Sequence, residues 1–310
     1  MRRVASIDIG SNSVLLLVAE LDRDDTLFAL DERIAITRLG KGVDVNGVLD
    51  AEAVERTLVA LEDLRAYAKT FDVDFLVAVG TAALRDAKNG ADFLQRAQEI
   101  IGCPVEVISG RREAELVLAG VQTSFEDIQP STVIFDVGGG STEFLLCDAR
   151  RGVVALSSLN IGSVRLTERH VSADPPNDAE CTAIRHDVLA ALNTLPAQLS
   201  QARPAELIGV AGTVTTLLTI REGLEVYDSQ VVNGARIDRA AIAAIIDRLR
   251  GVTLGSRRLI AGLEEKRADV ITAGSLIVET VMEHFAVDEL LVCDRGVRWG
   301  AAATKLREPT

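Results

Sequence analysis

A run of eleven residues near the start of the chain is echoed in its middle. Residues 7–17 read Ile-Asp-Ile-Gly-Ser-Asn-Ser-Val-Leu-Leu-Leu, and residues 135–145 read Phe-Asp-Val-Gly-Gly-Gly-Ser-Thr-Glu-Phe-Leu, 128 positions later. Both follow the pattern apolar, Asp, apolar, Gly, two small residues and Ser, and then continue into an apolar strand. Because 128 residues is about the length of one domain, the echo predicts two similar domains, each opening with a glycine-tipped β-hairpin.

Strand and helix patterns alternate after each hairpin, which is typical of an α/β fold. Apolar runs predict further strands at 75–79, 105–108, 206–210 and 289–293. Helical spacing is found at 51–70, 91–101, 112–121, 179–195, 240–249, 270–285 and 300–306, and a further helix is predicted from Thr213. The polar stretch 124–131, which contains Pro130, is the predicted linker. We therefore expect domains at 1–124 and 125–298, with a closing helix at about 299–310 that packs back on the first domain.

The charge balance limits which ligands the chain attracts. The sequence has 33 Lys and Arg against 46 Asp and Glu, a net charge of −13. Its overall field repels a polyanion, which disfavours nucleic-acid binding by a broad basic face. An anionic ligand would need local cations, backbone N–H groups or a metal ion.

Cysteine and hydropathy patterns point to an ordinary cytoplasmic protein. The four cysteines lie far apart without metal-ligand spacing, and we expect them to be small apolar core residues. No 18-residue apolar run is present, and no signal-peptide pattern precedes Asp8, so we expect a cytoplasmic protein that does not span a membrane.

The two glycine turns have the chemistry of an anion site. Successive N–H groups at such a turn form a nest for an anion, and hydroxyl side chains add donors. An Asp at the end of the first strand can hold Mg²⁺ directly or through water. One such turn alone fits a structural role equally well, but two favour a grip on one phosphate chain. The predicted phosphate-binding residues are Gly10, Ser11, Asn12, Ser13, Gly138, Gly139, Gly140, Ser141 and Thr142.

Further residues are candidates that also have a structural explanation. Gly212 and Thr213 follow a strand and open a helix, whose free N–H groups attract an anion, although Thr is also a common cap. Glu113 lies in the first turn of a helix, where it either activates a water molecule or complements the helix dipole. Arg85 is either a phosphate ligand or ordinary surface charge, and the same two explanations apply to Arg165, Arg257, Arg258, Lys266 and Arg267.

With these segments identified, the sequence resembles the exopolyphosphatase/guanosine-pentaphosphate phosphatase (Ppx/GppA) family. The matching runs occur in family order across nearly the whole chain: Ser6–Ser13, Val79–Asn89, Val107–Ala114, Phe135–Glu143, Asn160–Glu168, Gly212–Thr213 and Asp294–Gly300. Asp-x-Gly-Ser-Asn-Ser together with Asp-x-Gly-Gly-Gly-Ser-Thr-Glu is highly specific. The length is that of a short, two-domain member.

The resemblance implies two ribonuclease H-like α/β domains of the actin-like ATPase superfamily, flanking a phosphate-binding cleft. It implies Mg²⁺ as cofactor, with a monovalent cation such as K⁺ as a second candidate, and a homodimer. It further implies Glu113 as the catalytic base and Arg85 as a basic residue beside it. Asp8, Asp136 and Glu143 match the family's metal environment. At an ordinary pKa of about 4.3, Glu113 is expected to be ionised at neutral pH.

Two departures from the family pattern bear on the site. The acid that usually precedes the base is Arg112 here, so a two-carboxylate arrangement is not expected, and Arg112 is a candidate phosphate ligand. Where many members have Gly-Gly-Thr, this chain has Ala211-Gly212-Thr213. We expect the Ala211 methyl group to narrow the approach of the backbone to a phosphate.

The predicted function is Mg²⁺-dependent hydrolysis of the terminal phosphate of inorganic polyphosphate, by in-line attack of a water molecule. Guanosine pentaphosphate is the alternative substrate, because no base-binding motif separates the two. A superfamily kinase or ATPase and a non-catalytic sensor of polyphosphate or nucleotide are weaker alternatives.

Overall fold

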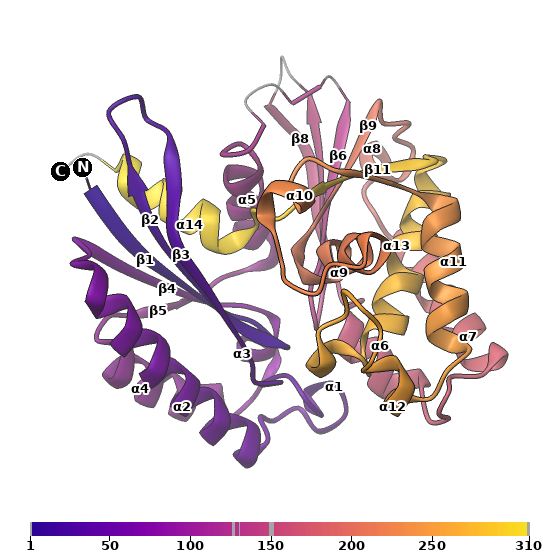
Figure 1. The fold of residues 1–310 in the computed structure, drawn as a ribbon, viewed down its shortest axis with the longest axis horizontal. Coiled ribbons are helices and arrows are strands. Elements are labelled where there is room, and N and C mark those ends of the chain that lie inside the picture. Colours follow the sequence, from indigo (N-terminus) through magenta and orange to yellow (C-terminus); the bar gives the residue numbers. More distant parts are fainter. Residues whose placement is uncertain (1, 126–127, 130, 149–151, 309–310) are drawn as a thin grey trace. The chain divides into compact units, whose positions relative to one another are not determined.

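The computed structural model describes residues 2–125, 128–129, 131–148 and 152–308. By its internal contacts the chain divides into two compact units (Figure 1). Unit 1 comprises Met1–Thr123 and Arg295–Thr310, and unit 2 comprises Ser124–Asp294. Pro130 of the predicted linker lies outside the described residues.

Unit 1 is built on a five-stranded mixed sheet with the order β3-β2-β1-β4-β5. Its strands are β1 (Arg2–Ile9), β2 (Ser13–Leu21), β3 (Leu27–Ile36), β4 (Phe75–Gly80) and β5 (Val105–Val107). The first three form an antiparallel meander, whereas β4 runs parallel to β1 and β5 runs parallel to β4. The parallel strands β1, β4 and β5 therefore end at one edge of the sheet, the carboxyl edge.

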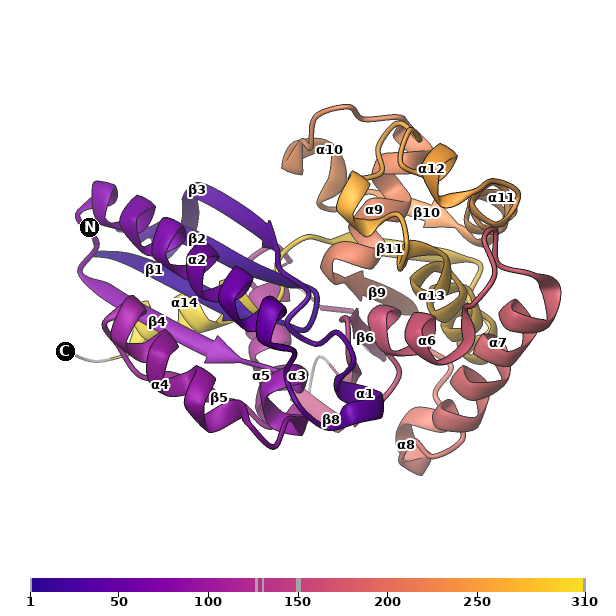
Figure 2. The same cartoon turned by 90° about the horizontal axis from the view of Figure 1, so that it is seen from below.

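Helices cover both faces of this sheet (Figures 1 and 2). The long helices α2 and α4 pack on one face over the core around Ile7, Leu16 and Leu61, and α14 packs on the other face. The helical segments are α1 (Val43–Asn46), α2 (Ala51–Ala68), η1 (Lys69–Phe71), α3 (Ala82–Asp86), α4 (Gly90–Ile101), α5 (Gly110–Val121) and α14 (Val297–Arg307).

Helices α5 and α14 approach each other closely because glycines line their contact. A Cβ atom on Gly300 would lie 1.8 Å from the carbonyl oxygen of Leu116, and one on Gly120 would lie 2.4 Å from that of Gly296. Both distances are far below van der Waals contact, so a side chain at either position would push the helices apart. This contact fixes the position of α5, which carries Glu113, on unit 1.

Unit 2 repeats the strand order of unit 1 with one strand added. Its sheet has the order β10-β11-β9-β6-β7-β8, in which β10 extends the β11 edge as an antiparallel strand. The strands are β6 (Thr132–Val137), β7 (Thr142–Asp148), β8 (Gly152–Leu159), β9 (Glu206–Val210), β10 (Arg236–Asp238) and β11 (Glu289–Cys293). The predicted α/β fold with two repeated domains is confirmed.

The repeat extends to an irregularity of the sheets. In unit 1 the pairing of the second and third strands shifts register between Val18 and Ala19, and in unit 2 it shifts between Leu146 and Cys147. These positions are again 128 residues apart. A β-bulge flips the side chains beyond it to the other face, so neither β3 nor β8 has one continuous alternating pattern. For this reason the sequence pattern predicts neither strand.

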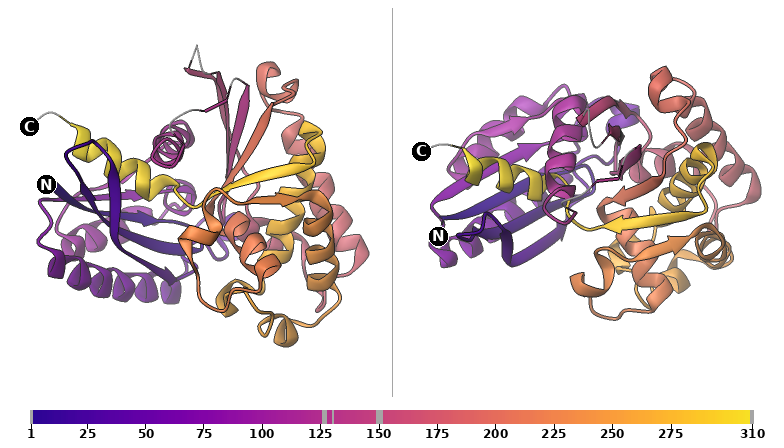
Figure 3. Two further views of the ribbon diagram at one scale, coloured as in Figure 1. Left: turned by 45° about the horizontal axis from the view of Figure 1, so that its top comes forward. Right: turned by 90° about the horizontal axis from the view of Figure 1, so that it is seen from above.

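The largest core lies on one face of the unit 2 sheet, around the central helix α13 (Figure 3). Helix α13 is buried along nearly its whole length. The helical segments are α6 (Ser163–His170), α7 (Asp178–Leu192), α8 (Ala197–Ser200), α9 (Ala211–Glu222), α10 (Ser229–Val232), α11 (Arg239–Arg250), α12 (Leu254–Arg257), η2 (Glu265–Arg267) and α13 (Ile271–Phe285). Helix α9 begins two residues before the predicted Thr213.

Hydropathy over the described residues finds no helix that combines the length and the apolar character needed to cross a membrane.

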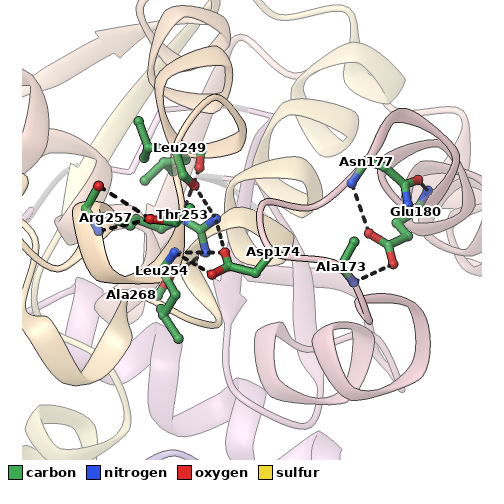
Figure 4. A network of polar contacts seen from close by, with 11 residues as sticks. Ala173, Asp174, Asn177, Glu180, Leu249, Thr253, Leu254, Arg257 and Ala268 are labelled. Carbon is green, nitrogen blue, oxygen red and sulfur yellow. Dashed lines mark hydrogen bonds and ion pairs between the residues drawn. The ribbon is translucent and has the colours of Figure 1, made fainter.

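Two polar residues of unit 2 hold connecting segments in place (Figure 4). Arg257 is buried and donates hydrogen bonds to the carbonyl oxygens of Leu249, Ala268 and Val252. Its interpretation as surface charge is therefore wrong. At the start of α7, the carboxylate of Glu180 accepts hydrogen bonds from four donors: the N–H groups of Ser172, Ala173 and Asn177, and the hydroxyl group of Ser172. These bonds lower the pKa of Glu180 to about 2.

The Glu180 contacts predict a pH-dependent contribution to stability. The folded-state pKa lies below the unfolded value, so the contribution is complete above about pH 4.5 and is lost as the pH falls towards 2. We expect Glu180→Gln to lower the free energy of unfolding by about 1–3 kcal/mol at pH 7, and by much less near pH 3. Urea unfolding at both values measures this, with the exposed Glu225→Gln as control. A loss that is equal at both pH values would contradict the prediction.

Candidate functional site

The two glycine turns predicted from the echo have the same backbone structure. The N–H group of Gly10 donates to the carbonyl oxygen of Ser13 at 2.9 Å, and the N–H group of Gly138 donates to that of Ser141 at 3.0 Å. Each turn joins the first two strands of its unit at the carboxyl edge of the sheet. The repeat therefore places one equivalent turn in each unit.

Each turn is supported from behind by the segment that follows the third strand. In unit 1, the N–H groups of Thr37 and Arg38 donate to the carbonyl oxygen of Asn12, and Gly40 donates to that of Ser11. In unit 2, Ser163 donates to the carbonyl oxygen of Gly138, and Val164 and Arg165 donate to that of Gly139. These bonds turn the carbonyl groups of both turns towards the protein.

The amide groups of the turns remain available for a ligand. In the part of the chain that the structure describes, no acceptor is found for the N–H groups of Ser11 and Asn12 or of Gly139 and Gly140. Successive N–H groups of this kind form an anion-binding nest. Neutral amides of this kind favour an anion even in a chain whose net charge is −13.

Glycines at two supporting positions permit this close backing. A Cβ atom on Gly40 would lie 2.7 Å from the Cβ atom of Ser11, and one on Gly162 would lie 2.3 Å from the carbonyl oxygen of Gly139. Side chains at these positions would displace the turns. The supporting role of either glycine could not be predicted from the sequence, because β3 and β8, the strands that precede them, were not predicted.

Asp8 is the penultimate residue of β1 and is buried. It alternates with Val4 along the strand, so it faces the side of the sheet that α14 covers. Burial, and next the negative charge of Glu113, raise its pKa to about 7, whereas the positive charge of Arg298 opposes the rise. The Oδ1 atom of Asp8 is buried without a hydrogen-bond partner. A buried carboxylate with an unused oxygen is suited to a cation, so the residues present fit Mg²⁺, which needs few carboxylates and keeps much of its water.

Glu113 lies in the first turn of α5, which Ser109 caps by accepting a hydrogen bond from the Arg112 N–H group. Its carboxylate is buried and receives a hydrogen bond from Arg85 Nη1 at 3.0 Å. Arg85 Nη1 also donates to the carbonyl oxygen of Ile108 at 2.9 Å, so it holds Glu113 at a fixed place. Burial raises the pKa of Glu113, and Arg85 opposes that rise. The expectation of an ordinary pKa for Glu113 is therefore wrong.

The second turn is flanked by two carboxylates where the first has one. Asp136 and Glu143 are direct partners across β6 and β7, and both are buried. Ser158 of β8 donates its hydroxyl hydrogen to Glu143 Oε1 at 2.7 Å. The position equivalent to Glu143 in unit 1 is Leu15, which pairs with Asp8. The two halves of the repeat therefore differ in charge: unit 2 has an additional acid.

The first turn of α9 follows β9 directly and lies at the same edge of the unit 2 sheet. The hydroxyl group of Thr213 donates to the carbonyl oxygen of Val137, and that of Thr142 donates to Ile161, so both side chains brace the turn. The guanidinium group of Arg267 covers Gly212, because a Cβ atom there would lie 2.4 Å from Nη1. Arg267 thus supplies a local cation at the N-terminus of α9. Its position in the sequence alone did not distinguish Arg267 from a surface arginine.

The structure gathers the predicted residues into two separate sets. In unit 1, the Gly10–Ser13 turn, Asp8, Arg85 and Glu113 come together at the carboxyl edge of the sheet. In unit 2, the Gly138–Ser141 turn, Asp136, Glu143, Gly212 and Thr213 do so. Among the described residues, no three His, Cys, Asp or Glu side chains form a group able to hold a metal ion. The metal role of Asp8, Asp136 and Glu143 stays a prediction. Arg112, the candidate phosphate ligand, forms an ion pair with Glu115 at 3.4 Å.

Removing the buried charge of Asp8 is expected to stabilise the metal-free protein. Because its folded-state pKa is above the unfolded value, ionised Asp8 destabilises the fold increasingly as the pH rises from about 4 to 7. With a chelator present, Asp8→Asn should raise the free energy of unfolding by about 1–3 kcal/mol at pH 8, and by less at pH 5. Thermal unfolding tests this against the exposed control Asp63→Asn. A lower melting temperature for Asp8→Asn at pH 8 would contradict the prediction.

The backbone at Ala211 explains why glycine suits that position. Ala211 has φ +71°, in the left-handed region where a Cβ atom costs about 1–2 kcal/mol. Ala211→Gly removes this strain but adds about 0.5–1 kcal/mol of unfolded-state entropy. We expect a net gain in stability of up to about 1 kcal/mol, measured by urea unfolding. The control Ala240→Gly, on an exposed and regular turn of α11, should instead destabilise the protein. If both variants have a lower free energy of unfolding than the wild type, Ala211 is not strained.

Comparisons with known proteins show the family of this chain. The family model described as "Ppx/GppA phosphatase family" matches residues 17–308. Exopolyphosphatase 2 of Mycobacterium tuberculosis is 33% identical, covering 97% of this chain and 98% of that protein. The guanosine-5'-triphosphate,3'-diphosphate pyrophosphatase of Vibrio cholerae is 29% identical, covering 96% of this chain and 58% of that protein. The crystal structure of an exopolyphosphatase from Cytophaga hutchinsonii matches with a TM-score of 0.88 at 28% identity, covering 98% of each chain. The chain therefore belongs to the Ppx/GppA phosphatase family.

Proposed function

We propose that this protein is an exopolyphosphatase that hydrolyses the terminal phosphate of inorganic polyphosphate. The observation that carries the proposal is the buried Glu113 carboxylate, held by Arg85 at the same sheet edge as a turn with free N–H groups. A carboxylate fixed next to an anion site is placed to orient and deprotonate a water molecule. The name and near full-length match of the mycobacterial relative support the same activity.

The proposed reaction is an in-line displacement at phosphorus. A water molecule hydrogen-bonded to Glu113 attacks the terminal phosphorus, and its proton passes to the Glu113 carboxylate. The bond from that phosphorus to the bridging oxygen breaks, which releases inorganic phosphate and a chain shorter by one unit. The elevated pKa of Glu113 favours this proton transfer.

The turn amides supply most of the protein's charge stabilisation in this scheme. We propose that the amides of each turn, Ser11–Asn12 in unit 1 and Gly139–Gly140 in unit 2, bind phosphate oxygens of the substrate. Fixed N–H donors need no reorganisation as charge develops. Arg267 adds a cation near Gly212. Asp8, Asp136 and Glu143 are the proposed ligands of Mg²⁺, which would offset the charge of the phosphate oxygens.

Guanosine pentaphosphate is the second candidate substrate. The Vibrio cholerae relative, which is named for a guanosine substrate, favours it, and both substrates present the same terminal phosphoanhydride. We further propose a homodimeric, cytoplasmic enzyme that binds neither nucleic acid nor membrane, as the family resemblance and the net charge of −13 suggest.

Substitution of the proposed base tests the function most economically. Glu113→Gln should lower kcat for phosphate release by about 100-fold or more, with little change in KM, because the amide keeps the shape and loses the base. Glu115→Gln, exposed on the same helix, is the matched control. Free phosphate is measured after incubation with polyphosphate, guanosine pentaphosphate and ATP in Mg²⁺.

The outcomes of this assay separate the alternatives. Faster release from polyphosphate than from guanosine pentaphosphate supports the proposal, and the reverse preference favours the second candidate. Transfer from ATP alone identifies a kinase or ATPase, and binding without release identifies a sensor. Near-normal turnover of Glu113→Gln would remove Glu113 from the role of base.

A further inference from the structure

Strand β3 is a long sheet edge with few of the features that prevent pairing with another chain. It is the last strand of the unit 1 sheet, and among the described residues it pairs with β2 alone (Figure 2). One row of its backbone N–H and C=O groups therefore has no strand partner. The end strands β5 and β10 have three residues each, which limits such pairing, whereas β3 has ten. It also contains neither proline nor lysine, two residues that protect sheet edges.

Apolar side chains are exposed along this edge. Phe28 is 52% exposed, Leu30 39% and Ile34 56%. Leu30 is the residue that the β-bulge leaves without a partner in β2. The equivalent strand of unit 2, β8, is partly buried from Ala155 to Ser158. Of the two equivalent edges, β3 is therefore the one that is more open to a partner.

The charged residues in the middle of β3 are balanced by partners within unit 1. Asp31 Oδ1 lies 3.2 Å from Arg33 Nε, and Tyr67 of α2 donates a hydrogen bond to Asp31 Oδ2 at 2.6 Å. The guanidinium group of Arg33 also lies over the Tyr67 ring, 4.4 Å from its centroid. On the opposite face, Glu32 accepts a hydrogen bond from Arg298 Nε at 2.8 Å. The two acids of the strand are thus matched by two arginines, and the edge has no net charge that would repel a second strand.

Antiparallel pairing of β3 with the β3 strand of a second copy matches opposite charges. Cross-strand partners lie on one face of a sheet, so the twofold axis of such a pair lies level with one residue of the strand. An axis at Glu32 places Asp31 opposite Arg33 of the second copy, and the reverse. It also places Ile34 opposite Leu30, and the two Glu32 side chains meet with an Arg298 each. An axis at Asp31 or at Arg33 would instead bring two like charges together without a second partner, which is unfavourable.

We propose that two copies of this chain associate by antiparallel β3–β3 pairing centred on Glu32, which joins their unit 1 sheets into one. This inference goes beyond the proposed homodimer by naming its surface, and it is independent of the proposed reaction. Pairing gives hydrogen-bond partners to the outer row of backbone groups of both strands. It also removes the exposed Leu30 and Ile34 side chains from water. The charged pairs at positions 31 and 33 then fix the register.

Charge reversal at positions 31 and 33 tests the register. In Asp31→Arg protein both positions are basic, and in Arg33→Asp protein both are acidic, so like charges face each other twice in either dimer. We expect each variant to raise the Kd of the dimer by about tenfold or more, measured by sedimentation equilibrium. An equimolar mixture of the two variants should restore association, because a basic strand then faces an acidic one. Asp63→Arg, an exposed reversal on α2, is the matched control and should leave the Kd unchanged.

Cross-linking tests the centre of the pairing. With the axis at position 32, the two copies of that residue lie directly opposite each other, with Cβ atoms about 4.5–5.5 Å apart. Glu32→Cys should therefore form an intermolecular disulfide under mild oxidation, seen as a dimer in electrophoresis without reductant. Arg33→Cys, exposed on the same strand, is the control, because its two copies lie on a diagonal and should cross-link much less. The wild-type protein, with four cysteines, gives the background.

The combined results decide the proposal. Weaker association of both single variants with recovery in their mixture supports it, and the recovery shows that both variants are folded. A wild-type protein that is monomeric at every concentration measured overturns it, and so does a dimer that neither reversal weakens. Weakening without recovery in the mixture, or no excess cross-linking of Glu32→Cys over Arg33→Cys, also overturns it. None of these measurements uses phosphate release, so failure of the proposed function is distinguished from failure of β3 pairing.

Discussion

The central physical constraint is that a chain with a net charge of −13 belongs to a phosphatase family, whose substrates are phosphate anions. In this fold, backbone N–H groups provide the donors for an anion. Hydrogen bonds from the segments after β3 and β8 turn the carbonyl groups of both glycine turns inward, which leaves the N–H groups of Ser11, Asn12, Gly139 and Gly140 as donors. Amides are neutral, so the chain keeps its net charge of −13 and still has a place for phosphate.

The groups around these turns are held at a cost to stability. In unit 1, burial raises the pKa values of both Asp8 and Glu113. In unit 2, Ala211 adopts a left-handed backbone conformation next to Gly212. The close glycine contacts between α5 and α14 keep Glu113 in place although its carboxylate and that of Asp8 repel each other. Costs of this kind are typical of sites that are organised for a ligand rather than for the fold alone.

The sequence predicted the features that local pattern encodes. The echo at 128 residues predicted two equivalent turns, and apolar runs predicted most strands of both sheets. It did not reveal β3 and β8, because bulges at Val18/Ala19 and Leu146/Cys147 break their alternation. The supporting roles of Gly40 and Gly162 were invisible for the same reason.

Burial and long-range contact explain the remaining misses. The raised pKa of Glu113 follows from neighbours distant in sequence, and nothing local distinguishes the buried Arg257 or the Arg267 that covers Gly212 from surface arginines. The two copies of the repeated run also differ in charge at one position, because Glu143 in the second copy corresponds to Leu15 in the first. The family resemblance identified that acid, and the register of β6 and β7 shows it directly opposite Asp136.

The most direct test of the account is a crystal structure of Glu113→Gln protein with Mg²⁺ and polyphosphate. We predict that phosphate oxygens of the substrate lie within hydrogen-bonding distance of the Ser11 and Asn12 amides, with the substituted side chain of residue 113 beside the terminal phosphate. A terminal phosphate bound away from these amides and from residue 113 would contradict the proposed mechanism.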